Sequence, residues 1–73
     1  MREIQITGQG IRLGQLLKLA GVVDSGSDAK LLLAHETVLV NGESESRRGR
    51  QLALGDTVSV AGEELLVIPA APA

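Results

Sequence analysis

The sequence predicts an α+β fold with two short helices and several short antiparallel strands. Two stretches repeat leucine and alanine at helical spacing, other stretches alternate apolar with polar residues, and turn-forming pairs separate them. The chain has 73 residues, too few for more than one core. We therefore expect a single domain over residues 1–68 and a flexible C-terminal tail over residues 69–73.

The N-terminal part predicts a strand, a turn and a helix. Residues 2–6 alternate, with two isoleucines on one face, and Gly8 and Gly10 interrupt the pattern. From Leu13 the spacing changes to i, i+3, i+4 and i+7, which is one stripe of an amphipathic helix. Gly21 stands where the C-cap of that helix is expected.

A second helix is predicted to follow at once. Ser25 and Asp28 have the spacing of a capping box, which marks a helix start. Ala29, Leu32 and Leu33 then form a second apolar stripe. Two short helices are thus joined by a tight connection.

The C-terminal half predicts short strands. Residues 38–40 and 58–60 each alternate valine with another residue, and Asn41-Gly42 and Gly55-Asp56 are turn signals. The apolar run Leu65–Ile68 predicts a further strand at the sheet edge.

Composition excludes several classes of function. The chain has no Cys and one His, so no disulfide and no metal site of ordinary composition is expected. It has no aromatic residue on which a base can stack. The N-terminus lacks the apolar run of a signal peptide and no stretch has membrane-spanning length, so we expect a cytoplasmic protein.

No enzyme is predicted, because each candidate motif has a simpler explanation. Gly8-Gln9-Gly10 resembles the start of a dinucleotide-binding turn, but its third glycine is displaced and the chain is too short for the sheet that motif requires. His35 has no nucleophile at a recognisable spacing. The acidic pairs Glu43/Glu45 and Glu63/Glu64 lack apolar surroundings and are typical of a solvated strand surface. We expect no cofactor and no small-molecule substrate.

The distribution of charge is less ordinary than the composition. The net charge is -2, yet Arg47, Arg48 and Arg50 lie within four residues, in a segment without apolar periodicity. Gly49 and Gln51 beside them favour a loop or an irregular strand. Such a run is often only solvated surface, but its place after a predicted hairpin makes it a candidate contact surface.

The ordered set of motifs resembles the S4 domain family. The resemblance runs from about Ile11 to Val60 and comprises Ser25-Gly-Ser27-Asp28-Ala29-Lys30, Leu32-Leu33, Val38-Leu-Val40-Asn41-Gly42 and Leu54-Gly55-Asp56-Thr-Val58. It implies the αL motif, in which two helices pack on a small bent antiparallel sheet and a basic surface faces structured RNA. The chain also resembles small bacterial proteins that consist of an S4 domain and little else.

Carried over to this sequence, the resemblance implies an RNA-binding surface on both helices and beyond the Asn-Gly turn. Its residues are Arg12, Lys18, Ser27, Lys30, Asn41, Arg47, Arg48 and Arg50. The function expected from it is non-catalytic binding of structured RNA, ribosomal or transfer RNA, by contacts to phosphates, by a monomer that is ribosome-associated. The alternative is a protein-interaction module that docks on a ribosomal or other protein through Leu31, Leu39 and the open sheet edge. A β-grasp carrier is disfavoured, because such carriers end in Gly-Gly.

Overall fold

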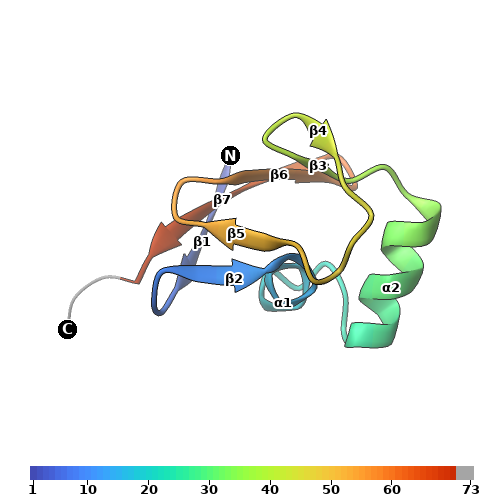
Figure 1. Ribbon diagram of the computed structural model, residues 1–73, viewed down its shortest axis with the longest axis horizontal. Helices are drawn as coiled ribbons and strands as arrows, with labels where there is room; N and C mark the ends of the chain where they lie inside the picture. Colours follow the sequence, from blue (N-terminus) through green and yellow to red (C-terminus); the bar gives the residue numbers. More distant parts are fainter. Residues whose placement is uncertain (71–73) are drawn as a thin grey trace.

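The computed structural model describes residues 1–70, which form two helices and seven strands (Figure 1). In chain order the elements are β1 (Arg2–Ile6), β2 (Gly10–Arg12), α1 (Leu13–Leu19), α2 (Gly26–His35), β3 (Leu39–Val40), β4 (Glu43–Ser44), β5 (Gln51–Ala53), β6 (Thr57–Val60) and β7 (Glu63–Pro69). The α+β class with two short helices is confirmed.

The strands form a five-stranded sheet in the order β1-β7-β6-β3-β4 and a two-stranded sheet of β2 and β5. All pairs are antiparallel except β1 with β7, where Ile4 lies opposite Val67 in parallel register. The larger sheet is therefore mixed. The expectation that Leu65–Ile68 forms an edge strand is wrong, because β7 lies between β1 and β6. Its unbroken apolar run suits a strand with neighbours on both sides.

Helix α1 forms where leucine spacing predicts it and ends at Leu19; its C-cap is Ala20, one residue before the expected Gly21. The amide of Gly21 donates to the carbonyl of Lys18 and the amide of Val22 donates to that of Leu17. Together with a φ of 76° at Gly21, these bonds make a Schellman motif. This left-handed residue turns the chain within a few residues towards α2.

Helix α2 begins at the predicted cap. The side chain of Ser25 accepts a hydrogen bond from the amide of Asp28 at 3.2 Å. Ala29 and Leu33 of the predicted stripe are buried and Leu32 is half-buried, while His35 lies exposed in the last turn. His35 is therefore a surface residue at a helix end.

The Asn41-Gly42 turn joins β3 to β4, with φ of 51° and 84° at its two residues. Positive φ at both positions matches the twist of a tight hairpin, which is why Asn-Gly predicts it. Ala61-Gly62 makes the same kind of turn between β6 and β7, with φ of 50° and 79°. Alanine is a poor signal for such a turn, so the sequence does not announce it.

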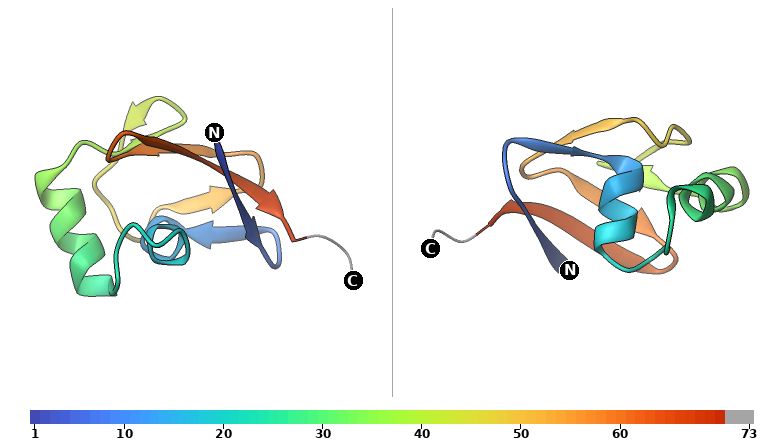
Figure 2. Two further views of the ribbon diagram at one scale, coloured as in Figure 1. Left: turned by 180° about the vertical axis from the view of Figure 1, so that it is seen from behind. Right: turned by 90° about the horizontal axis from the view of Figure 1, so that it is seen from below.

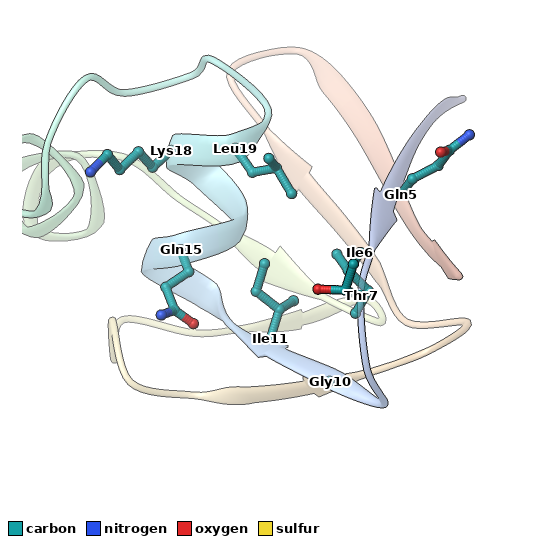
Figure 3. A pocket seen from close by; sticks show the side chains of 8 residues that line it. All are labelled: Gln5, Ile6, Thr7, Gly10, Ile11, Gln15, Lys18 and Leu19. Carbon is teal, nitrogen blue, oxygen red and sulfur yellow. The ribbon is translucent and has the colours of Figure 1, made fainter. Parts of the chain in front are cut away.

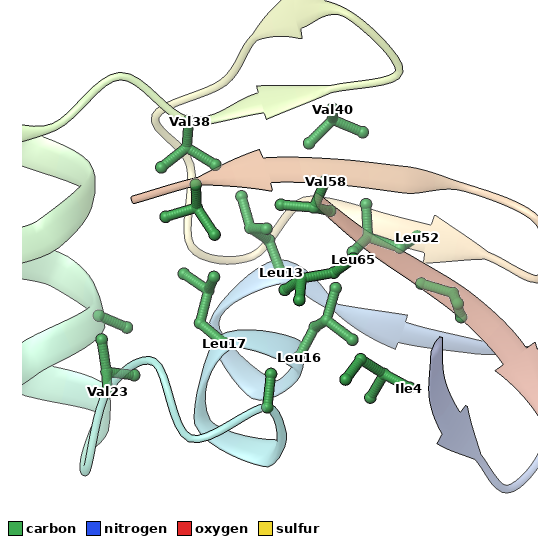
Figure 4. Packing of buried hydrophobic residues seen from close by; sticks show 14 of the residues in the cluster. Ile4, Leu13, Leu16, Leu17, Val23, Val38, Val40, Leu52, Val58 and Leu65 are labelled. Atoms are coloured by element: carbon green, nitrogen blue, oxygen red, sulfur yellow. The ribbon is translucent and has the colours of Figure 1, made fainter. Parts of the chain in front are cut away.

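A single cluster of aliphatic side chains lies between the helices and the sheet (Figure 4). Leu13, Leu16 and Leu17 project from α1 towards Val58 and Leu65 of the sheet, and all five are fully buried. None of the core residues within 1–70 is polar or charged. The charged side chains are therefore all at or near the surface, where their placement determines what the molecule can bind.

The two helices occupy different places around this core. Figures 1 and 2 show α2 at one end of the molecule and α1 beside β2, with the loop between β4 and β5 passing close to both helices. Neither helix of residues 1–70 is long and apolar enough to cross a membrane. Strand β7 includes Pro69, and the amide of Ala70 donates to the carbonyl of Ile6. The rest of the expected tail, 71–73, lies outside the described residues.

Candidate nucleic-acid interface

The arginine loop, residues 45–50, is fastened to the start of α1. The amide of Leu13 donates to the carbonyl of Arg50 at 2.8 Å, and the amide of Gly14 donates to the carbonyl of Arg48 at 2.9 Å. The first amides of a helix have no partner within the helix, so a neighbouring loop can satisfy them. These two bonds hold the loop against Arg12, which precedes α1.

The side chain of Arg48 lies across α1 and reaches α2. A Cβ built on Gly14 would lie 2.6 Å from Cγ of Arg48, so the arginine stem occupies the space that any side chain at Gly14 would need. At the far end, Nη1 of Arg48 donates to the carbonyl of Gly26 at 3.2 Å. Arg48 thus bridges the starts of both helices.

A basic hollow of about 500 Å³ opens beside this bridge. Three cationic side chains, those of Arg12, Lys18 and Arg48, line it together with Gly14, Gln15, Gly26 and Gly49. No carboxylate lines it among the residues that the structure describes. Arg12 and Lys18 are exposed, and neither side chain forms an ion pair within residues 1–70. Their charges are therefore available to a ligand.

Arg47 and Arg50 differ from Arg12 and Lys18, because both form ion pairs with Glu45. Nη2 of Arg47 lies 3.2 Å from Oε1 of Glu45, and Nη1 of Arg50 lies 2.9 Å from the same oxygen. Hydrogen bonds from the side chain and the backbone of Arg47, followed by one from Arg50, lower the pKa of Glu45 from 4.5 to about 2. Glu45 is ionised at neutral pH.

The remaining expected contact residues lie outside the hollow. Lys30 is exposed on α2, and Ser27 is exposed in the first turn of the same helix. The side-chain amide of Asn41 donates to Asp56 at 3.1 Å, and its oxygen accepts from the amide of Thr57 at 2.9 Å. Asn41 therefore ties its turn to β6, which is a structural task.

Arg2 is the one cation of the chain that the sequence did not offer as a contact. Its Nη2 donates to the carbonyl of Ala20 at 2.6 Å, and Nη1 lies 3.7 Å from Glu63. The residue satisfies a carbonyl at the C-terminal end of α1. We therefore interpret Arg2 as a structural residue.

A second hollow, of about 750 Å³, lies on the other side of α1 (Figure 3). Ile11 and Leu19 point into it, whereas Lys18 points away from it towards α2. Lys18 and Gln15 line both hollows, so the exposed face of α1 separates them. The second hollow is mainly apolar and contributes no further cation.

Two residues important for the site were missed by the sequence analysis. Gly14 lets the stem of Arg48 pass close to the start of α1, and a glycine gives no sequence signal of what lies over it. Glu45 was assigned to a solvated acidic pair with Glu43, although its position two residues before Arg47 could have suggested an ion pair. Loop contacts at such short spacing depend on backbone shape, which periodicity does not predict.

Comparison with known proteins identifies the family. The S4 domain family model matches residues 4–68. Over 59 residues the chain is 51% identical to "Probable ribosome maturation protein RlbA" of Bacillus subtilis (strain 168), covering 81% of this chain and 83% of that protein. Over 58 residues it is 40% identical to "Putative RNA-binding protein YbcJ" of Escherichia coli (strain K12), covering 80% and 83% respectively. The resemblance drawn from the motifs is thereby confirmed, and the chain belongs to the S4 domain family.

Proposed function

We propose that this protein binds structured RNA through the basic hollow, without chemical change to the RNA. The observation that carries the proposal is the convergence of Arg12, Lys18 and Arg48 on one hollow that no carboxylate of residues 1–70 lines, in a chain whose net charge is -2. A random placement of nine acidic and seven basic residues would not favour such a separation. The names of the two relatives, one for ribosome maturation and one for RNA binding, support the same function.

The chemistry of the hollow suits a phosphodiester backbone. Guanidinium groups contact phosphate oxygens through a planar fork, and the ammonium of Lys18 adds a movable point charge. The chain has no aromatic side chain, so stacking of single-stranded bases contributes nothing. Recognition by the shape and phosphate spacing of a folded RNA remains as the mechanism. Ribosomal RNA is our first choice of ligand and transfer RNA our second.

The protein-docking alternative has weaker support. Leu31 is 58% exposed, as that alternative requires. Leu39, however, is half-buried and lines a hollow of about 300 Å³ that Leu31 does not line. Leu31 and Leu39 therefore do not line that hollow together, whereas three cations line the basic hollow.

The test is a titration of labelled RNA followed by fluorescence anisotropy at several salt concentrations. Three phosphate contacts at about 0.7 to 0.9 each predict a slope of log K against log salt of roughly -2 to -3. A folded ribosomal RNA fragment should bind more tightly than transfer RNA, and both more tightly than a single strand of equal length. Absent binding, or a slope near zero, would refute the proposal and direct the search to a protein partner.

A matched pair of variants locates the interface. Lys18→Ala and Lys30→Ala each remove one exposed lysine that makes no ion pair within residues 1–70, but only Lys18 lines the hollow. We expect Lys18→Ala to reduce the magnitude of the salt slope by about 0.7 to 0.9, and Lys30→Ala to change it much less. Equal effects would mean that RNA senses only the net charge.

A further inference from the structure

The carboxylate of Glu45 is the centre of the arginine loop. Its Oε2 accepts from the backbone amides of Ser46 and Arg47, each at 3.0 Å, and from Nε of Arg47 at 3.2 Å. Its Oε1 accepts from Nη2 of Arg47 at 3.2 Å and from Nη1 of Arg50 at 2.9 Å. Five donors from three residues thus converge on one carboxylate, so the shape of the loop depends on it.

The arginines around Glu45 differ in how much of each side chain is exposed to a ligand. The side chain of Glu45 is only 8% exposed, that of Arg50 is 33% exposed and that of Arg47 is 73% exposed. Arg47 uses Nε and Nη2 to hold the carboxylate. The other edge of its guanidinium carries Nη1, which makes no hydrogen bond within residues 1–70 and can contact a phosphate without releasing Glu45. The three side chains together carry one positive charge.

Two roles for this carboxylate are physically possible, and they predict opposite effects on RNA affinity. As an internal competitor, Glu45 would occupy the arginines and would weaken the binding of phosphate. As a support, it would hold the arginines where phosphate meets them. The backbone bonds favour support, because a phosphate that displaced the carboxylate would also leave the amides of Ser46 and Arg47 without their partner.

The loop also forms one wall of the basic hollow. The carbonyls of Arg48 and Arg50 accept from the first amides of α1, and the side chain of Arg48 lines the hollow. A loop that lost its central carboxylate would hold these groups less firmly, since the bonds from Arg47 and Arg50 fix the chain on both sides of Arg48.

We propose that Glu45 is a positioning residue for RNA binding, which holds the arginine loop so that Arg48 forms the wall of the hollow and Arg47 offers its free guanidinium edge to a second phosphate. This inference rests on the proposed function. It assigns a role in RNA binding to an acidic residue, and it assigns a second phosphate contact to a residue outside the hollow. A negative charge near RNA is ordinarily unfavourable, so the expected effect of removing it is opposite to that of simple electrostatics.

The experiment compares Glu45→Gln with Glu43→Gln. Both changes remove one negative charge, and Glu43 is exposed and forms neither an ion pair nor a side-chain hydrogen bond within residues 1–70. If charge alone matters, both variants bind RNA equally or more tightly than the wild type. Under the proposal, Glu45→Gln binds roughly tenfold more weakly, as expected for the loss of one charge-assisted contact, and the magnitude of its salt slope falls by about 0.7 to 0.9. Tighter binding by Glu45→Gln would overturn the inference.

A second variant keeps the test independent of the folding of Glu45→Gln. Arg47→Gln removes the proposed outer contact and should reduce the salt slope in the wild-type background by about 0.7 to 0.9. In the Glu45→Gln background the same change should have a smaller effect, since Arg47 is then no longer held. An unchanged slope in Arg47→Gln would overturn the second phosphate contact.

The outcomes separate this inference from the proposed function. If the wild type does not bind RNA, both fail together. If the wild type binds and Glu45→Gln binds more tightly, only the positioning role fails. Amide hydrogen exchange supplies a reading that needs no RNA: the amides of Ser46 and Arg47 should exchange faster in Glu45→Gln than in Glu43→Gln. Equal exchange in the two variants would show that the carboxylate does not hold the loop.

Discussion

Gly14→Ala should displace the side chain of Arg48 without adding or removing any charge. A Cβ at this position would lie 2.6 Å from Cγ of Arg48 and 3.4 Å from its Cδ and its carbonyl oxygen. Favourable contacts between carbon atoms require about 3.5 to 4.0 Å, so Cγ must retreat by roughly 1 Å. Cγ lies near the backbone of the arginine, which is itself bonded to α1, so the side chain cannot swing clear without moving the loop.

Two opposing effects set the change in stability. Overpacking typically lowers the free energy of unfolding by about 1 to 3 kcal/mol, and replacing a helical glycine by alanine raises it by roughly 0.5 to 1 kcal/mol. We therefore expect a net loss of about 0 to 2.5 kcal/mol, or up to roughly 20 °C in Tm, at about 4 to 8 °C per kcal/mol for a domain of this size. RNA binding should weaken by roughly tenfold or more if Arg48 loses a charge-assisted contact.

The chain has no aromatic residue, so unfolding is best followed by far-UV circular dichroism and binding by a label on the RNA. Gly26→Ala is the matched control, because its Cβ would meet only Nη1 of Arg48 at 3.6 Å, an ordinary contact with the flexible end of the side chain. It should bind RNA nearly as the wild type does. If Gly14→Ala also binds like the wild type while remaining folded, the position of Arg48 does not matter for binding.

The other predictions concern acid stability, the turn after β3 and the chemistry of Arg48. Because the pKa of Glu45 is lowered to about 2 in the folded protein, its contribution to stability is complete above its unfolded value of 4.5 and is lost as pH falls towards 2; melts of the wild type should show this loss and those of Glu45→Gln should lack it. Asn41→Gly keeps the left-handed turn but removes the bonds to Asp56 and Thr57, so denaturant titration should show a loss of about 1 to 2 kcal/mol, with an unchanged RNA salt slope. Arg48→Lys retains charge but not the bidentate fork, so RNA affinity should fall severalfold while the salt slope stays within about 0.3 of the wild type.

Local signals predicted most of the elements. Ser25 caps α2 as its spacing with Asp28 indicates, and Gly21 follows the C-cap of α1 in the left-handed conformation that favours glycine. The Asn41-Gly42 turn likewise forms as predicted. Each of these features depends on a few neighbouring residues, so the sequence alone contains the necessary information.

Pairing between distant strands was not predictable in the same way. The alternation in residues 2–6 shows that one face of β1 is buried, but it does not reveal that β1 pairs in parallel with β7. The short β2–β5 ladder was also missed, because three-residue strands give too little alternation to recognise. Strand order depends on contacts between segments far apart in the chain, for which a single sequence holds no direct signal.

The candidate site was predicted as a set of charges, and the structure separates that set by environment. Arg12 and Lys18 form no ion pair within residues 1–70, Arg48 bridges two helices, and Arg47 and Arg50 share a carboxylate. A sequence gives all five the same formal charge, whereas their availability to a phosphate depends on which backbone and side-chain acceptors already hold them.

This separation explains how an acidic chain can bind a polyanion. Long-range repulsion between a net charge of -2 and RNA is screened beyond about 8 Å at physiological ionic strength, so affinity depends on the charges within that distance of the phosphates. The three charged side chains that line the hollow, among residues 1–70, are all positive. The remaining carboxylates repel RNA mainly at low salt, because the screening length increases to about 30 Å at 0.01 M. Binding should therefore show a weaker salt dependence at low ionic strength than the contact count predicts, because unscreened repulsion offsets part of the attraction, and a linear plot down to 0.01 M would contradict this account.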